Sequence, residues 1–422
     1  MPAFETALPG ERRRFWRIAG AGAAFQAGTA AIDTATIVAS LVFQLTGSAF
    51  AVGFASAALR LGWLLPQLVV GFFAERAERR MPFYVFGAYG RALVATLIAL
   101  LLWFGGGMAP AVLGVSFLGL WTLYAFVSGV VAVPYNDIVG RAIPSGLRSR
   151  MLAWRFFGGG LIALGVAAFA RLTLELLANL QAYALIFGLA ALLMILSSLL
   201  FVSAGEPPTA ARTAGRKAPR DARSFLRDGW QVLKNDSRFR LFLYSQWLGG
   251  ATLMALPFYV LAADASGVTQ TDVGLLLGAQ TVGALVSNPI WGKLGDGAGK
   301  LRMLQAVAVV RMLPPLLVLL LLGSSAGLVG YMALFVVIGA MMNGVTIGYL
   351  GYLMEISPDD RRPAYSAYFN ALASPAALLP LLGAALVSLI SIHAVFAASI
   401  LAALLQLVLL LRISRLAQEP SA

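Results

Sequence analysis

The chain has 422 residues, of which 60% are hydrophobic and only 12% charged, whereas a soluble domain has roughly 25% charged residues. It contains no cysteine and one histidine, which excludes disulfides, thiolate metal sites and histidine clusters. Acid-base or nucleophilic catalysis would rest on carboxylates and lysine alone. The composition therefore predicts an all-α integral membrane protein without metal or cofactor, and it argues against an enzyme.

Twelve hydrophobic runs are each long enough to cross a membrane core of roughly 30 Å, which takes about 20 residues. The first run is longer than the roughly 7 to 15 residues of a signal-peptide core, so we expect an uncleaved first span. The predicted spans are 18–45, 50–74, 82–104, 110–135, 152–174, 181–203, 240–263, 272–292, 301–323, 327–351, 364–390 and 393–412.

The positive charges gather on one side of these spans. If the N-terminus is cytoplasmic, nearly all of the 31 Lys and Arg residues fall on the cytoplasmic side, while Arg171 lies outside and Arg60, Arg91 and Arg311 lie within spans. This bias predicts a multi-pass protein of the plasma (cell inner) membrane with both termini in the cytoplasm. The net charge of +13 is then a consequence of topology, and it does not indicate nucleic-acid binding.

A change of composition divides the chain into two halves. Residues 205–238 are rich in basic residues and proline and poor in large apolar ones, which predicts a cytoplasmic linker between six-helix halves at 1–204 and 239–422. Within the linker, residues 225–233 have amphipathic spacing and predict a short helix on the membrane surface.

The two halves repeat a loop motif of glycine, acid and base. One copy follows the second span, and the other follows the eighth span about half a chain later, which indicates a duplicated unit. The copies are Gly71, Glu75 and Arg79, and Gly292, Asp296 and Lys300.

Polar residues recur at helical spacing along the first span. Steps of three and four place them on one face of a single helix, which would line a cavity or pack inside the bundle rather than face lipid. They are Gln26, Thr29, Asp33, Thr36, Ser40 and Gln44.

Two opposite charges lie in the middle of consecutive spans. At a rise of 1.5 Å per residue, Asp33 is about 22 Å and Arg60 about 15 Å into the membrane from the starts of their spans. We expect them to face one another, with Asp33 loading a proton or binding substrate. The alternative is a buried ion pair with a purely structural role.

Two further arginines, Arg91 and Arg311, lie in the cytoplasmic thirds of the third and ninth spans. Asp137 and Glu355, at the ends of the fourth and tenth spans, are the expected partners. These pairs would form a structural or gating network rather than a site of chemistry.

The hydrogen-bonding side chains in the spans of the second half are neutral, and no carboxylate lies in mid-span there. Prolines interrupt the ninth and eleventh spans, as is typical of helices that bend around a cavity. The residues expected to face a substrate or proton are Gln26, Asp33, Arg60, Tyr124, Gln246, Gln280, Asn343 and Asn370.

Together these features resemble the major facilitator superfamily. Its loop signature matches at the glycine, acid and base of both motif copies, although Glu75 replaces the usual Asp and Gly297 the usual Arg. The resemblance covers essentially the whole chain and implies a bundle of twelve helices in two pseudosymmetric halves. It also implies that the two loops latch the halves on the cytoplasmic side. The arginine and Gly-Pro signatures of the drug antiporters are absent, so no subfamily is assigned.

The expected function is secondary transport of a small, amphipathic organic solute by alternating access, as a permease or an efflux system, with proton coupling through Asp33. The expected partners are this solute, protons and membrane lipids, and we expect a monomer without nucleic acid. The alternative is a membrane assembly factor or receptor with the same fold that does not transport. A midplane sealed by mutual saturation of Asp33 and Arg60 would favour that alternative.

Overall fold

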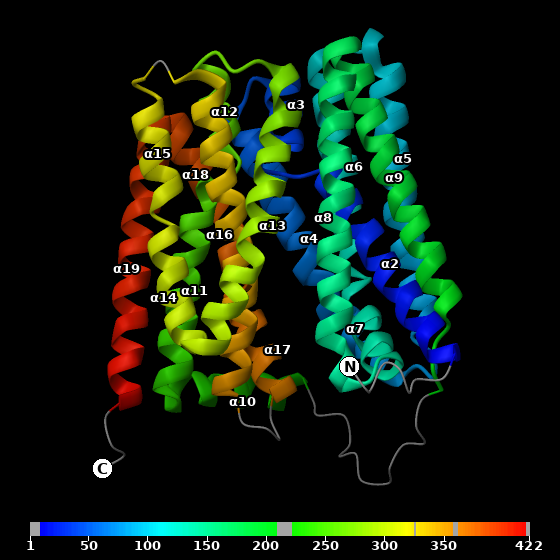
Figure 1. Cartoon of the computed structure of the whole chain (residues 1–422), viewed down its shortest axis with the longest axis vertical. Helices are drawn as coiled ribbons and strands as arrows, with labels where there is room; N and C mark the ends of the chain where they lie inside the picture. The colour runs from blue at the N-terminus through cyan, green and yellow to red at the C-terminus, as the bar shows by residue number, and fades with distance from the viewer. Residues whose placement is uncertain (1–8, 209–221, 325, 358–361, 419–422) are drawn as a thin grey trace. The chain divides into compact units, whose positions relative to one another are not determined.

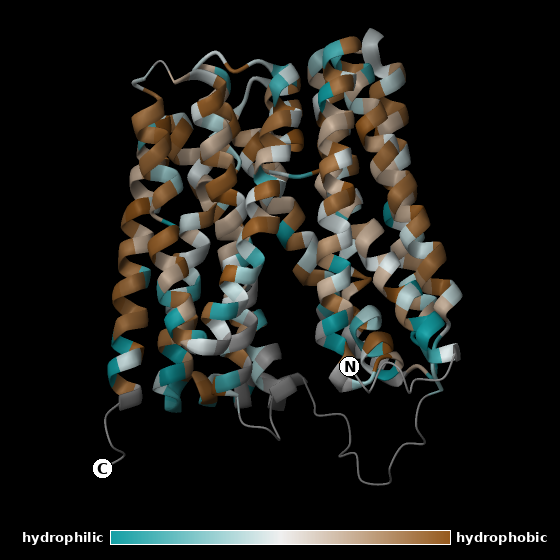
Figure 2. Ribbon diagram, in the orientation of Figure 1, coloured by the Kyte–Doolittle hydropathy of each residue, from teal (hydrophilic) through white to brown (hydrophobic). Residues whose placement is uncertain are grey.

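A computed structural model describes residues 9–208, 222–324, 326–357 and 362–418. Within these ranges the secondary structure is helical throughout, and eleven helices are long and apolar enough to cross a membrane. Helices α2 and α3 together occupy the remaining predicted span, the first one. The predicted fold class, an all-α membrane protein with twelve spans, is confirmed. Figure 2 shows hydrophobic residues along most of the length of α9 and α19.

The chain divides into two compact units. The first comprises Met1–Thr213 and Thr269–Thr281, and the second comprises Ala214–Val268 and Val282–Ala422. The division after Thr213 falls inside the segment predicted as the linker. The start of α13 groups with the first unit because η3 contacts α8.

In the first unit, α2 packs against α8 and α9, α5 packs against α6 and α9, and α4 packs against α6 (Figure 1). One part of its core joins Phe15, Tyr84, Ile138 and Phe201, which are at most 2% exposed. The helices are α2 (Pro9–Ala31), α3 (Ile37–Thr46), α4 (Ala49–Arg76), α5 (Met81–Phe104), η1 (Gly105–Gly107), α6 (Pro110–Gly129), α7 (Ala132–Ala142), α8 (Ser145–Leu176), α9 (Asn179–Ala204) and η3 (Gln270–Asp272).

In the second unit, α11 packs against α19, and α14 packs against α16 and α19. An aromatic core around Phe239, Phe242 and Phe369 joins α11 to α17. The helices are α10 (Ala222–Asn235), α11 (Ser237–Thr252), η2 (Leu253–Ala255), α12 (Phe258–Ala265), α13 (Val273–Gly297), α14 (Lys300–Val310), α15 (Leu313–Leu321), α16 (Gly327–Ile356), α17 (Arg362–Ala373), η4 (Ser374–Leu378), α18 (Leu379–Leu389) and α19 (Ile392–Gln418).

Glycine permits the close approach of α4 and α6. A Cβ atom on Gly62 would come within 2.5 Å of Ala125, and one on Gly129 would collide with the Gly62 carbonyl oxygen. Small residues at helix crossings are typical of membrane proteins, where association depends on close van der Waals packing.

Several spans are interrupted where proline removes a backbone donor. The ninth span divides into α14 and α15 before Pro314 and Pro315, and the eleventh divides around Pro375 and Pro380, as predicted. The amphipathic helix predicted in the linker is also confirmed as a helix, because α10 covers residues 225–233.

Candidate functional site

The first span is broken at Asp33. Helix α2 ends at Ala31 and α3 begins at Ile37, so the prediction of one continuous helix over 18–45 is wrong. The Asp33 Oδ1 atom accepts hydrogen bonds from the Ala35 backbone N–H at 2.9 Å and from the Thr36 hydroxyl at 3.0 Å. Aspartate commonly bonds the backbone two residues ahead, and this local bond competes with the helix.

The break explains why two expectations for this span fail. The six polar residues do not share one helical face, because they are divided between α2, the break and α3. Asp33 and Arg60 do not form an ion pair either. The turn after Asp33 supplies the donors that its carboxylate was expected to find on Arg60. The Gln280 side chain, which belongs to the same unit, lies beside this carboxylate.

Beyond the break, the polar residues of α3 bond to α9. The Tyr183 hydroxyl donates to Ser40 Oγ at 3.0 Å, and Gln44 Nε2 donates to the Tyr183 hydroxyl at 3.1 Å. Ser40 and Tyr183 are buried. These hydrogen bonds hold α3 against α9. The Asp33 end of the span is therefore the candidate for contact with a solute.

Arg91 is buried, but its expected partner is elsewhere. The guanidinium carbon of Arg91 lies 4.1 Å from the centroid of the Phe25 ring, and the residue is 2% exposed. Asp137 instead forms ion pairs with Arg80 and Arg141, at 3.7 and 2.7 Å. The predicted Arg91–Asp137 pair is therefore wrong, because Asp137 lies in an exposed part of α7 and Arg91 points into the bundle.

A second interior arginine escaped the sequence analysis. Arg155 of α8 lies 5.9 Å from the Phe25 ring centroid and 5.4 Å from that of Tyr135, and its Nη1 atom donates to the Tyr135 hydroxyl at 3.0 Å. The charge bias assigns it to the cytoplasmic side, because it lies near the start of the fifth predicted span. The signal was present, since Arg155 falls inside the predicted span 152–174.

Glu206 caps helix α5 from a distance. Its carboxylate accepts the backbone N–H groups of Arg80 and Met81, at 2.9 Å each, and the guanidinium of Arg141 at 2.7 Å. Helix N-termini expose unbonded N–H groups and attract negative charge. Burial alone would raise the pKa of Glu206, but the Arg141 side chain and the two N–H groups hold it below its usual 4.5.

We call Arg80, Asp137, Arg141 and Glu206 the end cluster. It lies on the side of the first unit that the charge bias predicts to be cytoplasmic. Glu206 was missed because it directly follows Gly205 at the start of a linker with a net positive charge, where a single carboxyl group does not stand out.

The loop motifs are only partly visible. The side chains of Glu75 and Asp296 and the surroundings of Gly71 lie outside the described residues, Arg79 is exposed, and Gly292 and Lys300 are half-buried. The role of these loops in gating stays a prediction.

In the second unit, Arg311 is 2% exposed, and its Nη1 atom donates to Gln406 Oε1 of α19 at 2.6 Å. Glu355 is exposed near the end of α16 and forms no ion pair with Arg311. The predicted pair is wrong because Arg311 faces α19, where the neutral side-chain amide of Gln406 accepts its hydrogen bond.

The other predicted residues bond mainly to the helices around them. Asn343 donates to the Ala284 carbonyl oxygen at 2.7 Å, and Asn370 accepts from the Tyr349 hydroxyl at 3.0 Å. The Tyr124 hydroxyl lies 3.7 Å from the sulfur of Met194, and Tyr124 is buried. Gln26 and Gln246 are half-buried, and a Cβ atom on Gly159 would come within 2.6 Å of Gln26.

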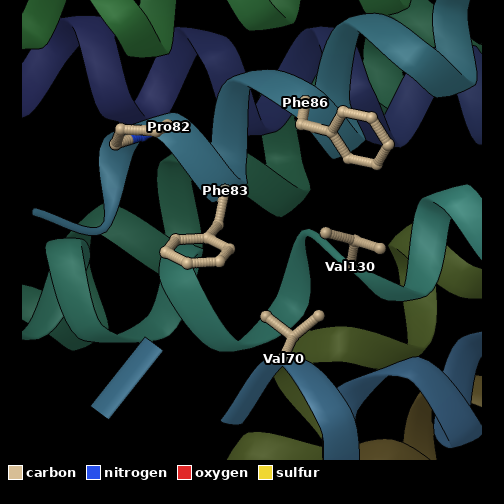
Figure 3. Close-up of a pocket in the computed structure, with 5 residues that line it drawn as sticks. All are labelled: Val70, Pro82, Phe83, Phe86 and Val130. Atoms are coloured by element: carbon tan, nitrogen blue, oxygen red, sulfur yellow. The ribbon is translucent and has the colours of Figure 1, made fainter. Parts of the chain in front are cut away.

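An apolar cavity of about 430 Å³ lies in the first unit between α4, α5 and the junction of α6 and α7. Figure 3 shows Pro82, Phe83 and Phe86 of α5 approaching Val70 and Val130 around it. The described residues of the lining are all apolar and offer no group to orient a polar solute. The candidate site is therefore the Asp33 break and the arginines beside Phe25.

Comparison with known proteins shows what the chain is similar to. Residues 248–421 match the family model described as Major Facilitator Superfamily. The chain is therefore similar to this superfamily over its C-terminal part. A search of curated proteins finds no match. Among solved structures, a mutant of the nucleoside transporter NupG matches with a TM-score of 0.72 at 12% identity, over 95% of this chain and 99% of that one.

A POT family transporter in complex with 5-aminolevulinic acid also matches, with a TM-score of 0.65 at 12% identity, over 95% of each chain. Identities this low show a common fold and carry no information on the solute. The fold of these transporters thus matches nearly the whole chain, including the residues before 248 that the family model does not cover.

Proposed function

We propose that this protein is a secondary transporter of the major facilitator superfamily that moves a small organic solute across the membrane by alternating access. The observation that supports this most is the break at Asp33, a half-buried carboxylate in the interior of a membrane span. Irregular backbone at membrane depth is tolerated where it is buried in protein or lines a water-filled cavity. Transporters use such breaks to place peptide groups and side chains against a solute or an ion.

Asp33 is also the residue that would bind and release the coupled proton. A carboxylate in a membrane interior is costly to keep ionised, so its charge changes readily with the access of water. Protonation would remove the negative charge and weaken the bonds from Ala35 and Thr36 that hold the turn. Alternate loading and release of this proton would couple a pH gradient to solute movement, in either direction, as uptake or efflux.

The alternative, an assembly factor or receptor with the same fold, would be favoured by an Asp33 saturated by Arg60. That pair is not formed. We place the protein in the plasma (cell inner) membrane with cytoplasmic termini, acting as a monomer on a soluble small molecule and without catalysis.

The experiment is a solute screen with the purified protein in liposomes, run with and without an imposed pH gradient. We expect at least one solute to accumulate faster than in protein-free liposomes, and the gradient to change its rate. In Asp33→Asn, transport should lose its dependence on pH while the protein keeps its thermal stability.

The matched control is Asp264→Asn, which changes a carboxylate on α12 outside the candidate site. If Asp33→Asn transports with the rate and pH dependence of the wild type, Asp33 has no part in coupling. If no solute in the screen crosses faster than through lipid alone, the transport proposal itself is contradicted.

A further inference from the structure

Two arginines share one aromatic ring inside the first unit. The guanidinium carbons of Arg91 and Arg155 lie 4.1 and 5.9 Å from the centroid of the Phe25 ring. At 1.5 Å per residue, Arg91 lies about 15 Å from the start of its span at Met81, and Arg155 lies about 8 Å from the start of its span at Arg150. The pair therefore lies within the membrane-spanning segments, nearer to one end of them than to their middle.

No described carboxylate neutralises this pair. Neither arginine takes part in the ion pairs of the described residues, and the ionisable groups that act on Arg91 are Tyr84, Tyr124, Tyr135 and Arg155. The Nε atoms of both arginines are buried and have no hydrogen-bond acceptor. Buried charges are ordinarily paired, and buried donors ordinarily have acceptors.

The side chain of Arg155 packs closely against α2. A Cβ atom on Gly22 would come within 2.6 Å of Arg155 Cδ, so glycine at this position makes room for the arginine side chain. On the other side, the Tyr135 hydroxyl accepts from Arg155 Nη1. The guanidinium is therefore held in one place by its surroundings, although no described residue there carries a negative charge.

We propose that Arg91 and Arg155 bind the anionic group, a carboxylate or a phosphate, of a soluble organic solute. This inference rests on the proposed transport function and names the class of its substrate. The planar guanidinium presents donors in a fork that matches both anions. Arg155 and Phe25 are half-buried while Arg91 is buried, so the anion meets Arg155 first and Arg91 last.

The test uses the full chain in nanodiscs of zwitterionic lipid. The probes are benzoate and phenyl phosphate, with benzyl alcohol as the neutral match, and the readout is the melting temperature as a function of probe concentration. We expect either anion to raise the melting temperature and benzyl alcohol to leave it unchanged. Arg91→Gln and Arg155→Gln should each weaken anion binding at least about tenfold, because losing one partner of a desolvated charge pair commonly costs more than that.

The matched control is Arg148→Gln, which removes an arginine two turns earlier on the same helix α8. Arg148 is exposed and donates to backbone carbonyl oxygens, so its loss should not change anion binding. Arg155→Lys keeps the charge without the fork and should bind anions more weakly than the wild type but better than Arg155→Gln. This ordering identifies a charge contact even if the Gln variants are less stable.

Three results would overturn the proposal. The first is equal stabilisation by anions and benzyl alcohol, and the second is unchanged anion binding in both Gln variants. The third is stabilisation that requires phosphatidylglycerol in the nanodisc and is lost in the variants, which would make a lipid headgroup the ligand. Failure of the transport function is distinguishable, because the wild type would then bind the anions without moving any solute in liposomes.

Discussion

The first unit treats its arginines in two opposite ways. At the end cluster, Arg80 and Arg141 are met by Asp137 and Glu206, which together neutralise them. In the interior, Arg91 and Arg155 lie against Phe25 with no described carboxylate. Carboxylates therefore accompany the arginines at the helix ends, and no described carboxylate accompanies the two arginines inside the bundle. The comparison teaches that the end cluster is structural, while the interior pair is reserved for a ligand.

The largest expected effect comes from breaking this contrast with Arg155→Glu, which places a carboxylate in the interior. The new charge would pair with Arg91 and repel an incoming anion. Like-charge contacts cost several kcal/mol, so we expect benzoate and phenyl phosphate to bind about 100-fold more weakly or worse. The nanodisc melting assay measures this. A variant that still binds anions as the wild type does would show that the pair is not the anion site.

The second unit offers a third setting for arginine, in which Arg311 bonds to the neutral Gln406. Replacing this amide by Gln406→Leu should cost about 1.5–3 kcal/mol, the range for hydrogen bonds to charged groups. The double variant with Arg311→Leu should recover much of the loss, since removing both partners leaves no buried donor unpaired. Thermal unfolding of the two single variants and the double variant measures the coupling. Strict additivity of the two losses would contradict it.

The end cluster should respond to acid. Because the pKa of Glu206 is lowered in the folded state, its contribution to stability is present above the unfolded pKa of about 4.5 and disappears as the pH falls through the folded value. Glu206→Gln should therefore be about 1 kcal/mol less stable at pH 7 and lose less on acidification. Glu175→Gln, in an exposed pair with Arg171, should change little. If the melting temperatures of the wild type and Glu206→Gln fell by the same amount from pH 7 to pH 3, this role would be contradicted.

The smallest effect is expected at the ring between the interior arginines. Phe25→Leu removes the aromatic face below Arg91 and should cost about 0.5–1 kcal/mol, while Phe25→Tyr should keep it. Melting temperatures of the two variants give the comparison. If both variants lose the same stability, the ring acts through packing alone.

The sequence predicted the spans well because length and hydrophobicity decide whether a helix crosses a membrane. Proline interruptions at Pro314 and Pro375 were also predictable, since the missing donor is visible in the sequence. The break at Asp33 was not, because aspartate breaks a helix only when its side chain finds the backbone ahead. Helical spacing that continues through Asp33 therefore predicted one continuous polar face.

The partners of the charged residues were harder to predict than the spans. Asp137 and Arg91 lie at similar depth in sequence terms, but depth does not specify which way a side chain points around a helix. Arg311 meets Gln406, which lies 95 residues away and carries no charge to suggest the contact. The overlooked Arg155 and Glu206 lie at the borders between span and loop. There the charge bias assigns a residue to one side of the membrane but does not indicate which residue it contacts.

Access to the first span from both sides of the membrane tests the transport proposal most directly. The natural chain has no cysteine, so a single Gln26→Cys substitution can be labelled without background. Alternating access predicts that a membrane-impermeant thiol reagent reacts with this position when added to either side of the membrane, while Leu41→Cys, at a fully buried position, stays unreactive. Reaction of Gln26→Cys from one side only, or from neither, would contradict the account.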